Sequence, residues 1–229
     1  MTNKYMYFIA NWKMYGGLNS LNSLDKVINF LKNFKKRKLA TIIYCPPATL
    51  ICPLTKKLKK TTIKVGAQNC NENYFSGAHT GSINASMLKN VGARYVIIGH
   101  SENRQKGEND KLINLKIKNS IKSGLKVIFC IGESLKEKRK KMTKKVLVKQ
   151  LTNGLKNVKN KKNIIIAYEP IWSIGTGLIP NTYDLFRIID FIKQKTAGKL
   201  KVLYGGSVNN INIKDLKKIN NIDGFLVGG

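Results

Sequence analysis

Eight short apolar runs, most of them rich in β-branched residues, alternate along the chain with segments of helical spacing. Uninterrupted apolar runs are typical of strands buried on both faces of a parallel sheet. Strand–helix alternation predicts right-handed crossovers, and eight strands favour a closed sheet over an open, doubly wound one. The sequence therefore predicts an α/β fold, a parallel (β/α)8 barrel. Its predicted strands are Tyr5–Asn11, Ala40–Cys45, Thr62–Gly66, Arg94–Ile98, Lys126–Cys130, Asn163–Tyr168, Leu200–Leu203 and Gly224–Val227.

The segments between these runs have the apolar spacing of amphipathic helices. No linker rich in Pro, Gly or Ser divides the 229 residues. We therefore expect residues 1–229 to form a single barrel domain that carries the catalytic site. The predicted helices are Leu18–Phe34, Thr49–Lys60, Ser86–Val91, Asp110–Ser123, Leu135–Asn157, Asn181–Thr196 and Asn210–Ile219.

The net charge of +30 admits two interpretations. A balance of this size is typical of proteins that bind nucleic acids or acidic membranes. However, 37 of the 42 basic residues are lysines spread along the whole chain, whereas a dedicated nucleic-acid binder favours arginine. The first interpretation is a solvated surface that A/T-rich codons have enriched in lysine, and the second is some affinity for polyanions. We favour the first and expect no specific nucleic-acid partner.

The chain has four cysteines and only two histidines, and no two cysteines form a C-x-x-C pair. We therefore expect free thiols and no metal site. No stretch approaches about 18 consecutive apolar residues, so no membrane span is expected. These features predict a soluble protein of the cytoplasm.

The carboxyl ends of the strands carry the active site of such a barrel. Asn11 and Lys13 follow the first strand, where the lysine could neutralise a phosphate or an enolate and Asn11 could orient it. His100 follows the fourth strand, and Ser101 could cap a short helix there. A helix N-terminus favours a neutral imidazole that donates one hydrogen bond. The structural alternatives are a surface cation for Lys13 and a buried structural side chain for His100.

Glu169 stands directly after the sixth predicted strand and is followed by a proline, a large aromatic residue and a Gly-Thr-Gly segment. The proline fixes the direction of the chain, and the glycines allow it to move. This is the arrangement expected of a catalytic base beneath a lid that excludes water. The predicted lid residues are Pro170, Ile171, Trp172, Ser173, Ile174, Gly175, Thr176 and Gly177.

Glycines also follow the last two strands, in the segment Tyr204–Val208 and at Gly228 and Gly229. Backbone N–H groups can close on a phosphate dianion there, and Ser207 adds a hydroxyl. Barrels of this kind usually hold phosphate on these two loops. A base, a neutral electrophile, a cation, a lid and a phosphate cradle together predict proton abstraction beside a carbonyl of a small phosphorylated substrate, without a cofactor.

Over almost its entire length the sequence resembles the triosephosphate isomerase family. The segments that carry the resemblance are N-W-K-M at Asn11–Met14, A-Q-N-C at Ala67–Cys70, G-A-H-T-G at Gly77–Gly81, G-H-S-E at Gly99–Glu102, C-I-G-E at Cys130–Glu133, A-Y-E-P-I-W-S-I-G-T-G at Ala167–Gly177 and Y-G-G-S-V at Tyr204–Val208. The resemblance implies a TIM barrel and an aldose–ketose isomerase of glycolysis and gluconeogenesis. Its reaction would interconvert dihydroxyacetone phosphate and D-glyceraldehyde 3-phosphate through an enediolate.

The resemblance also implies residue roles. Glu169 would shuttle the proton, His100 would polarise the carbonyl, Lys13 would offset negative charge and Asn11 would help to hold the substrate. Glu133 would hold Trp172 in the open lid, and Thr80 would reach across a homodimer to support Asn11 and Lys13 of the partner. The residues implied to receive the phosphate are Gly175, Ser207, Gly228 and Gly229, in addition to Asn11 and Lys13.

The sequence departs from the family pattern at several places. Asn103 and Ser82 replace an Arg and a Glu, which fits the loss of one ion pair at the dimer interface, and Tyr15 replaces an Asn. The second lid hinge, at residues 178–180, is about two residues short. The chain stops at Gly229, where the family continues, so we expect a barrel without its final helix. An alternative function is therefore a catalytically decayed barrel that binds polyanions.

Overall fold

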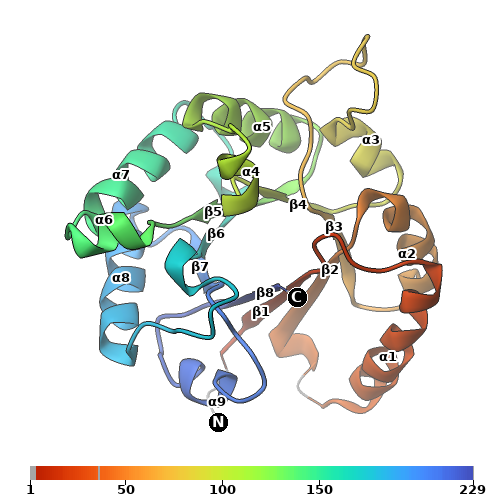
Figure 1. Ribbon diagram of the computed structural model, residues 1–229. Coiled ribbons are helices and arrows are strands. Elements are labelled where there is room, and N and C mark those ends of the chain that lie inside the picture. The colour runs from red at the N-terminus through yellow and green to blue at the C-terminus, as the bar shows by residue number, and fades with distance from the viewer. Residues whose placement is uncertain (1–3, 36, 229) are drawn as a thin grey trace.

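Eight parallel strands form a closed barrel in the computed structural model of the chain, which describes residues 4–35 and 37–228 (Figure 1). Each strand pairs with the next along the chain, and the last pairs with the first. The predicted barrel is thus confirmed, with each strand within a few residues of its expected place. The strands are β1 (Met6–Asn11), β2 (Ala40–Cys45), β3 (Lys64–Ala67), β4 (Tyr95–Ile98), β5 (Lys126–Ile131), β6 (Ile164–Tyr168), β7 (Lys201–Tyr204) and β8 (Gly224–Gly228).

Helices surround the barrel as an outer layer (Figure 1). The α-helices are α1 (Leu24–Asn33), α2 (Ile51–Leu58), α3 (Ala85–Asn90), α4 (Ser101–Gln105), α5 (Asp110–Lys122), α6 (Leu135–Arg139), α7 (Thr143–Gly154), α8 (Thr182–Lys195) and α9 (Ile213–Leu216). Short 3-10 helices are η1 (Leu18–Ser23), η2 (Arg37–Leu39), η3 (Ala48–Leu50), η4 (Lys161–Asn163) and η5 (Ile171–Ser173). No helix within the described residues is long and apolar enough to cross a membrane.

Four predicted helices differ from those observed. Those expected over Leu18–Phe34 and Thr49–Lys60 begin with the 3-10 helices η1 and η3 before α1 and α2. The single helix expected over Leu135–Asn157 is divided into α6 and α7, because Lys141 adopts a left-handed backbone conformation with φ of 57°. The helix expected over Asn210–Ile219 contains only the four residues of α9. β8 reaches Gly228, and Gly229 lies outside the described residues.

Consecutive residues of each strand enter two different apolar layers. Ile97 points into the barrel, where it packs with Ile9, Ile128 and other inward side chains. Its neighbours Val96 and Ile98 belong instead to the layer between the strands and the helices. Both faces of β4 are therefore buried, which explains the uninterrupted apolar runs of the sequence.

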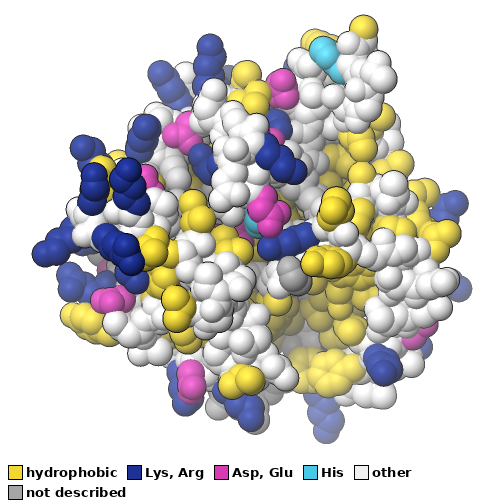
Figure 2. All heavy atoms as spheres, in the orientation of Figure 1, with side chains coloured by type: hydrophobic (Ala, Val, Ile, Leu, Met, Phe, Trp, Pro, Cys, Tyr) yellow, Lys and Arg dark blue, Asp and Glu magenta, His cyan; other side chains and the backbone are white. Residues whose placement is uncertain are grey.

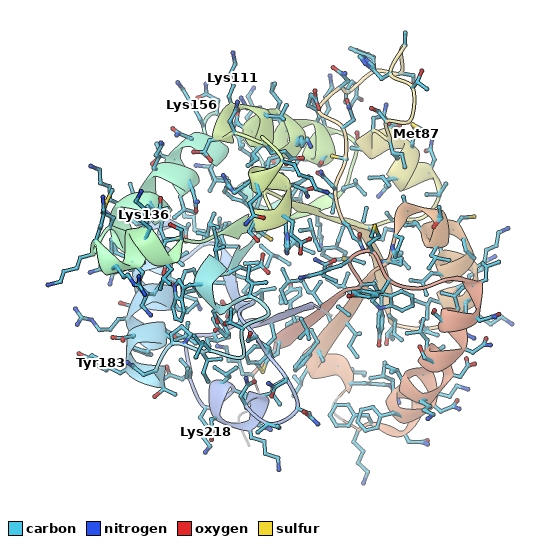
Figure 3. All side chains as sticks on the ribbon, in the orientation of Figure 1. Met87, Lys111, Lys136, Lys156, Tyr183 and Lys218 are labelled. Atoms are coloured by element: carbon cyan, nitrogen blue, oxygen red, sulfur yellow. The ribbon has the colours of Figure 1, made fainter. Side chains whose placement is uncertain are left out.

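Charged side chains lie mostly on the outer faces of the helices. The labelled lysines Lys111, Lys136, Lys156 and Lys218 point away from the barrel (Figure 3). Basic side chains also gather over α6 and α7 at one side of the space-filling view (Figure 2). The +30 charge thus lies largely outside the apolar layers.

Asp223, directly before β8, ties together β7 and β1, the two strands on either side of β8. Its buried carboxylate accepts a hydrogen bond from the Val202 N–H of β7 at 2.9 Å and lies 2.7 Å from Lys193 Nζ of α8. Its backbone carbonyl accepts from the Tyr7 N–H of β1 at 2.9 Å. Burial opposes ionisation of Asp223, but the hydrogen bonds from Lys193 and Val202 outweigh it and hold the pKa below its ordinary value of 3.8.

We expect Asp223→Asn to lower the free energy of unfolding by about 2 kcal/mol at pH 7, because it removes a buried charge-assisted hydrogen bond. A carboxylate whose pKa is lowered by folding stabilises the protein above its unfolded pKa and loses this effect as pH falls through the folded value. The difference between wild type and variant should therefore disappear below the ordinary pKa of 3.8. Urea unfolding of both proteins at several pH values measures this difference in the free energy of unfolding.

Asp215→Asn is the matched control, since Asp215 forms an exposed ion pair with Lys218. An exposed pair contributes little to stability, so this variant should unfold like the wild type. Equal effects of the two substitutions at pH 7 would contradict the role given to Asp223.

Candidate active site

The predicted catalytic residues meet at one end of the barrel, because all eight strands end there. Asn11 is the last residue of β1, His100 follows β4 and Glu169 directly follows β6. They line a common cavity of about 260 Å³. An acidic, a histidine and a basic side chain lie together at the centre of this face in Figure 2. The cavity is lined by Asn11, Lys13, His100, Glu169, Ile174, Gly175, Gly177, Gly205, Ser207, Val208, Asn209 and Gly228.

Glu169 is a buried carboxylate with one free oxygen. Its backbone N–H donates to Ile131 O at 2.8 Å, which fixes the residue at the end of the barrel. Its Oε1 lies 3.8 Å from His100 Nε2, and its Oε2 has no hydrogen-bond partner among the described residues. Burial raises the pKa of Glu169 above its ordinary value of 4.5, although the nearby His100 and Lys13 oppose the increase. The site thus holds a strengthened base with room to accept a proton.

His100 caps the N-terminus of α4 with its own side chain. Its Nδ1 accepts a hydrogen bond from the Glu102 N–H at 3.3 Å. A ring nitrogen that accepts must carry a lone pair, so the imidazole is neutral and its remaining proton is on Nε2. This Nε2 is the atom that faces Glu169. The predicted neutral ring near a helix start agrees with this geometry, but the predicted cap was wrong: Ser101 is the first residue of α4.

Lys13 is held by its neighbours in the loop after β1. Its N–H donates to Asn11 Oδ1 at 3.1 Å, and its carbonyl accepts from Gln68 Nε2 at 2.7 Å. The backbone has φ of 51°, an uncommon conformation for a non-glycine residue. Its Nζ lies 3.0 Å from Glu102 Oε1 and lines the cavity with Asn11 and Gly228. The cation is therefore fixed in place at the site.

The first half of the predicted lid is anchored to the loop after β5. Trp172 Nε1 donates to Glu133 Oε1 at 2.9 Å, and the Tyr168 hydroxyl donates to the same carboxylate. Burial raises the pKa of Glu133 despite these hydrogen bonds. Lys138 of α6 places its Nζ 3.3 Å from the centroid of the Trp172 ring, within range of a cation–π contact. The expected Glu133–Trp172 pair is thus present.

The second half of the lid enters the cavity beside the predicted phosphate cradle. Gly175 and Gly177 have φ of 69° and 75° and line the cavity together with Ser207 and Gly228. The Gly177 N–H donates to Ser207 Oγ at 3.1 Å. The other predicted cradle residue, Gly229, lies outside the described residues.

Gly205 and Val208 also line the cavity, and both belong to the segment Tyr204–Val208 in which the sequence predicted phosphate binding. Asn209, the next residue, was not predicted and carries no such signal.

Thr80 does not line the cavity of its own chain. It lies exposed in the segment between β3 and α3, which extends away from the barrel (Figure 1). The Asn71 N–H donates to Ile83 O at 2.7 Å and closes the base of this segment. Ser82 lies in the same segment, whereas Asn103 lies on α4, where its neighbour Arg104 forms a 2.7 Å ion pair with Asp110.

The four cysteines, Cys45, Cys52, Cys70 and Cys130, are free thiols, as the sequence predicted. Among residues 4–35 and 37–228 no group of three His, Cys, Asp or Glu side chains is placed to hold a metal ion. The chemistry that this site offers is that of the base, the neutral imidazole and the cation. These groups suit proton transfer at a carbon beside a carbonyl.

The comparisons with known proteins agree with this geometry. The family model of triosephosphate isomerase matches residues 6–229. The triosephosphate isomerase of Bradyrhizobium diazoefficiens is 39% identical, with 100% of this chain and 94% of the relative aligned. That of Aquifex aeolicus is 41% identical over 96% of this chain and 91% of its own. The crystal structure of triosephosphate isomerase from Bartonella henselae superposes with a TM-score of 0.88 at 34% identity, over 98% of this chain and 92% of that one. The chain therefore belongs to the triosephosphate isomerase family.

Proposed function

We propose that the chain interconverts dihydroxyacetone phosphate and D-glyceraldehyde 3-phosphate by proton transfer through an enediolate. The observation that supports this most directly is the buried Glu169 carboxylate, whose free oxygen shares a cavity with the His100 imidazole and the Lys13 ammonium. Such an enzyme acts in glycolysis and gluconeogenesis. The matches reported above give no support to the alternative, a decayed barrel that binds polyanions.

In the proposed reaction Glu169 removes a proton from the carbon beside the substrate carbonyl. The electrons of that C–H bond form the new C=C bond, and the carbonyl oxygen becomes an enediolate oxygen. His100 stabilises this oxygen by donating its Nε2–H, and Lys13 offsets the negative charge. The hydroxyl proton of the enediolate then passes to the former carbonyl oxygen, so that the negative charge moves to the other oxygen. Glu169 returns its proton to the former carbonyl carbon while the charged oxygen forms the new C=O bond, which completes the exchange of ketone and aldehyde without a cofactor.

Binding of the substrate phosphate is assigned to residues at the rim of the cavity. Gly175, Ser207 and Gly228 lie around it and offer backbone N–H groups. Gly229 is included on its sequence position alone. Asn11 supports the substrate beside Lys13, to which it is hydrogen bonded. The lid, residues 170–177, excludes water while the enediolate exists.

We also propose a homodimer. Large apolar side chains are exposed beside Lys13 and on the projecting segment: Met14 is 95% exposed, Tyr15 68% and Phe75 76%. Exposed apolar groups of this kind mark protein interfaces. In a twofold dimer the segment with Thr80 would dock beside Met14 of the partner, and the reverse contact would form equally. The four free cysteines fit a reducing compartment, so we assign the protein to the cytoplasm.

We expect Glu169→Gln to lower kcat by roughly a thousandfold, because general-base catalysis contributes about 10²–10⁴-fold and an amide cannot accept the proton. A coupled spectrophotometric assay of triose phosphate isomerisation measures it. The matched control is Asp190→Asn on the outer helix α8, which removes an equal charge and should leave kcat unchanged. Wild-type activity in the Gln variant would rule out Glu169 as the base.

The pH dependence follows from the raised pKa of Glu169. The base must be ionised, so kcat/KM should fall as pH falls through the pKa of the free enzyme. We expect this acid limb at a pH above the ordinary value of 4.5, since burial raises the pKa. Circular dichroism over the same range provides the control for folding. An acid limb at or below 4.5 would contradict the assignment.

Sedimentation or light scattering should give about twice the chain mass of 25.7 kDa. The double variant Met14→Lys, Phe75→Lys should be a monomer, because it places charges in the proposed interface. Ile211→Lys is the control, since Ile211 is 81% exposed on the loop before α9 and outside that interface. A monomeric wild type at catalytic concentrations would exclude the dimer.

A further inference from the structure

Ser173 carries a buried hydroxyl that the proposed mechanism does not use. It is the last residue of η5 in the lid and is fully buried, with 0% exposure. The lid residues that follow it are much more open, and residues 175–179 are all exposed. Ser173 is therefore the buried point from which the exposed part of the lid extends.

One chain of hydrogen bonds runs through the side chain of Ser173. Its hydroxyl donates to the carbonyl oxygen of Leu178, the first residue after the lid. The same oxygen lies 3.1 Å from the Tyr204 hydroxyl, at the end of β7. A serine hydroxyl has one proton, and here that proton forms the hydrogen bond to Leu178. Tyr204 must therefore be the donor of the second hydrogen bond. Burial raises the pKa of Tyr204 to about 12, so its proton is present.

A second chain of hydrogen bonds meets the backbone of Ser173. The Ser207 hydroxyl donates to the Ser173 carbonyl oxygen. The Ser207 oxygen also accepts a hydrogen bond from the Gly177 N–H at 3.1 Å. The hydroxyl thus donates its single proton once and accepts once. One series of hydrogen bonds includes Leu178 and the other includes Gly177, and both series meet at Ser173. They join the two halves of the lid to β7 and to the turn that follows it.

Gly206 shows that the turn after β7 is shaped around this contact. A Cβ atom on Gly206 would lie 2.5 Å from Ser173 Oγ and 2.5 Å from the Tyr204 hydroxyl oxygen. Both distances are far below a normal contact, and both oxygens are buried. The absence of a side chain at Gly206 therefore leaves the space that the Ser173–Tyr204 hydrogen bond occupies.

We propose that Ser173 is a positioning residue that fixes the lid over the phosphate end of the cavity. Ile174 and Gly175, the next two residues, line that cavity. A lid segment that is ordered before the substrate arrives loses less conformational entropy on binding, so the substrate phosphate binds more tightly. The inference rests on the proposed isomerase function, whose phosphate site it details.

The test compares Ser173→Ala with Tyr204→Phe, with the double variant and with Ser120→Ala. Ser120 is a matched control, since its hydroxyl is fully buried and its only side-chain hydrogen bond among the described residues is with Cys70. Loss of one net hydrogen bond corresponds to roughly a tenfold change in an equilibrium constant. We therefore expect KM for the triose phosphate and the inhibition constant of inorganic phosphate to rise together by about tenfold in Ser173→Ala, with kcat within about threefold.

Further readouts separate positioning from stability. Tyr204→Phe should show a smaller rise than Ser173→Ala, and the double variant should match Ser173→Ala, because both changes remove the same hydrogen bond. Hydrogen exchange of the amides in residues 174–178 should accelerate in Ser173→Ala and stay unchanged in Ser120→Ala. The proposal would be overturned if Ser173→Ala lowered Tm but left KM and the inhibition constant of phosphate unchanged. It would also be overturned if the effects of Ser173→Ala and Tyr204→Phe on KM multiplied in the double variant.

The phosphate and exchange measurements also distinguish this proposal from the proposed function. A wild type without isomerase activity would refute the function, while weaker phosphate binding and faster lid exchange in Ser173→Ala would still support the role of Ser173. An active wild type whose phosphate binding and lid exchange do not respond to Ser173→Ala would refute the role and leave the function intact.

Discussion

Pairing of the last strand with the first is the constraint on which the site depends. β8 runs beside β1 over five residue pairs, from Tyr7 opposite Gly224 to Asn11 opposite Gly228. At Gly224 the two backbones approach so closely that a Cβ would lie 2.1 Å from the Tyr7 carbonyl oxygen. The residue also has φ of 152°, which side chains rarely allow. Closure therefore needs glycine there, and it places the proposed cradle residue Gly228 beside Asn11.

Within this closed barrel the proposed base is strong because it is buried. A charged carboxylate without full hydrogen bonding is disfavoured in a protein interior. Glu169 combines burial, one free oxygen and a raised pKa, and the neighbouring His100 and Lys13 limit the penalty. His100 is neutral in this environment because its Nδ1 already accepts a hydrogen bond from the Glu102 N–H. The incomplete hydrogen bonding of the buried Glu169 carboxylate thus makes it the stronger base that the proposed reaction needs.

The sequence predicted the strands, and with them the meeting of Asn11, His100 and Glu169 at one end of the barrel, because the strand signals are local. Runs such as Tyr95–Ile98 are apolar on both faces, and residues at strand ends must meet in a closed barrel. The break at Lys141 was not predictable in this way, since no glycine or proline stands between α6 and α7. The role proposed for Ser173 was also hidden, because its partner Tyr204 comes from another strand and becomes a neighbour only after folding.

The lid is held at two consecutive residues by two different parts of the barrel. Trp172 is bound by Glu133 of the loop after β5, whereas Ser173 is bound by Tyr204 of β7. A rigid displacement of the lid would break both attachments at once. A rotation about the backbone between these residues could release one attachment while the other remains. Since Leu178 is hydrogen bonded to the Ser173 hydroxyl, such a rotation would also displace residue 178 or break that bond.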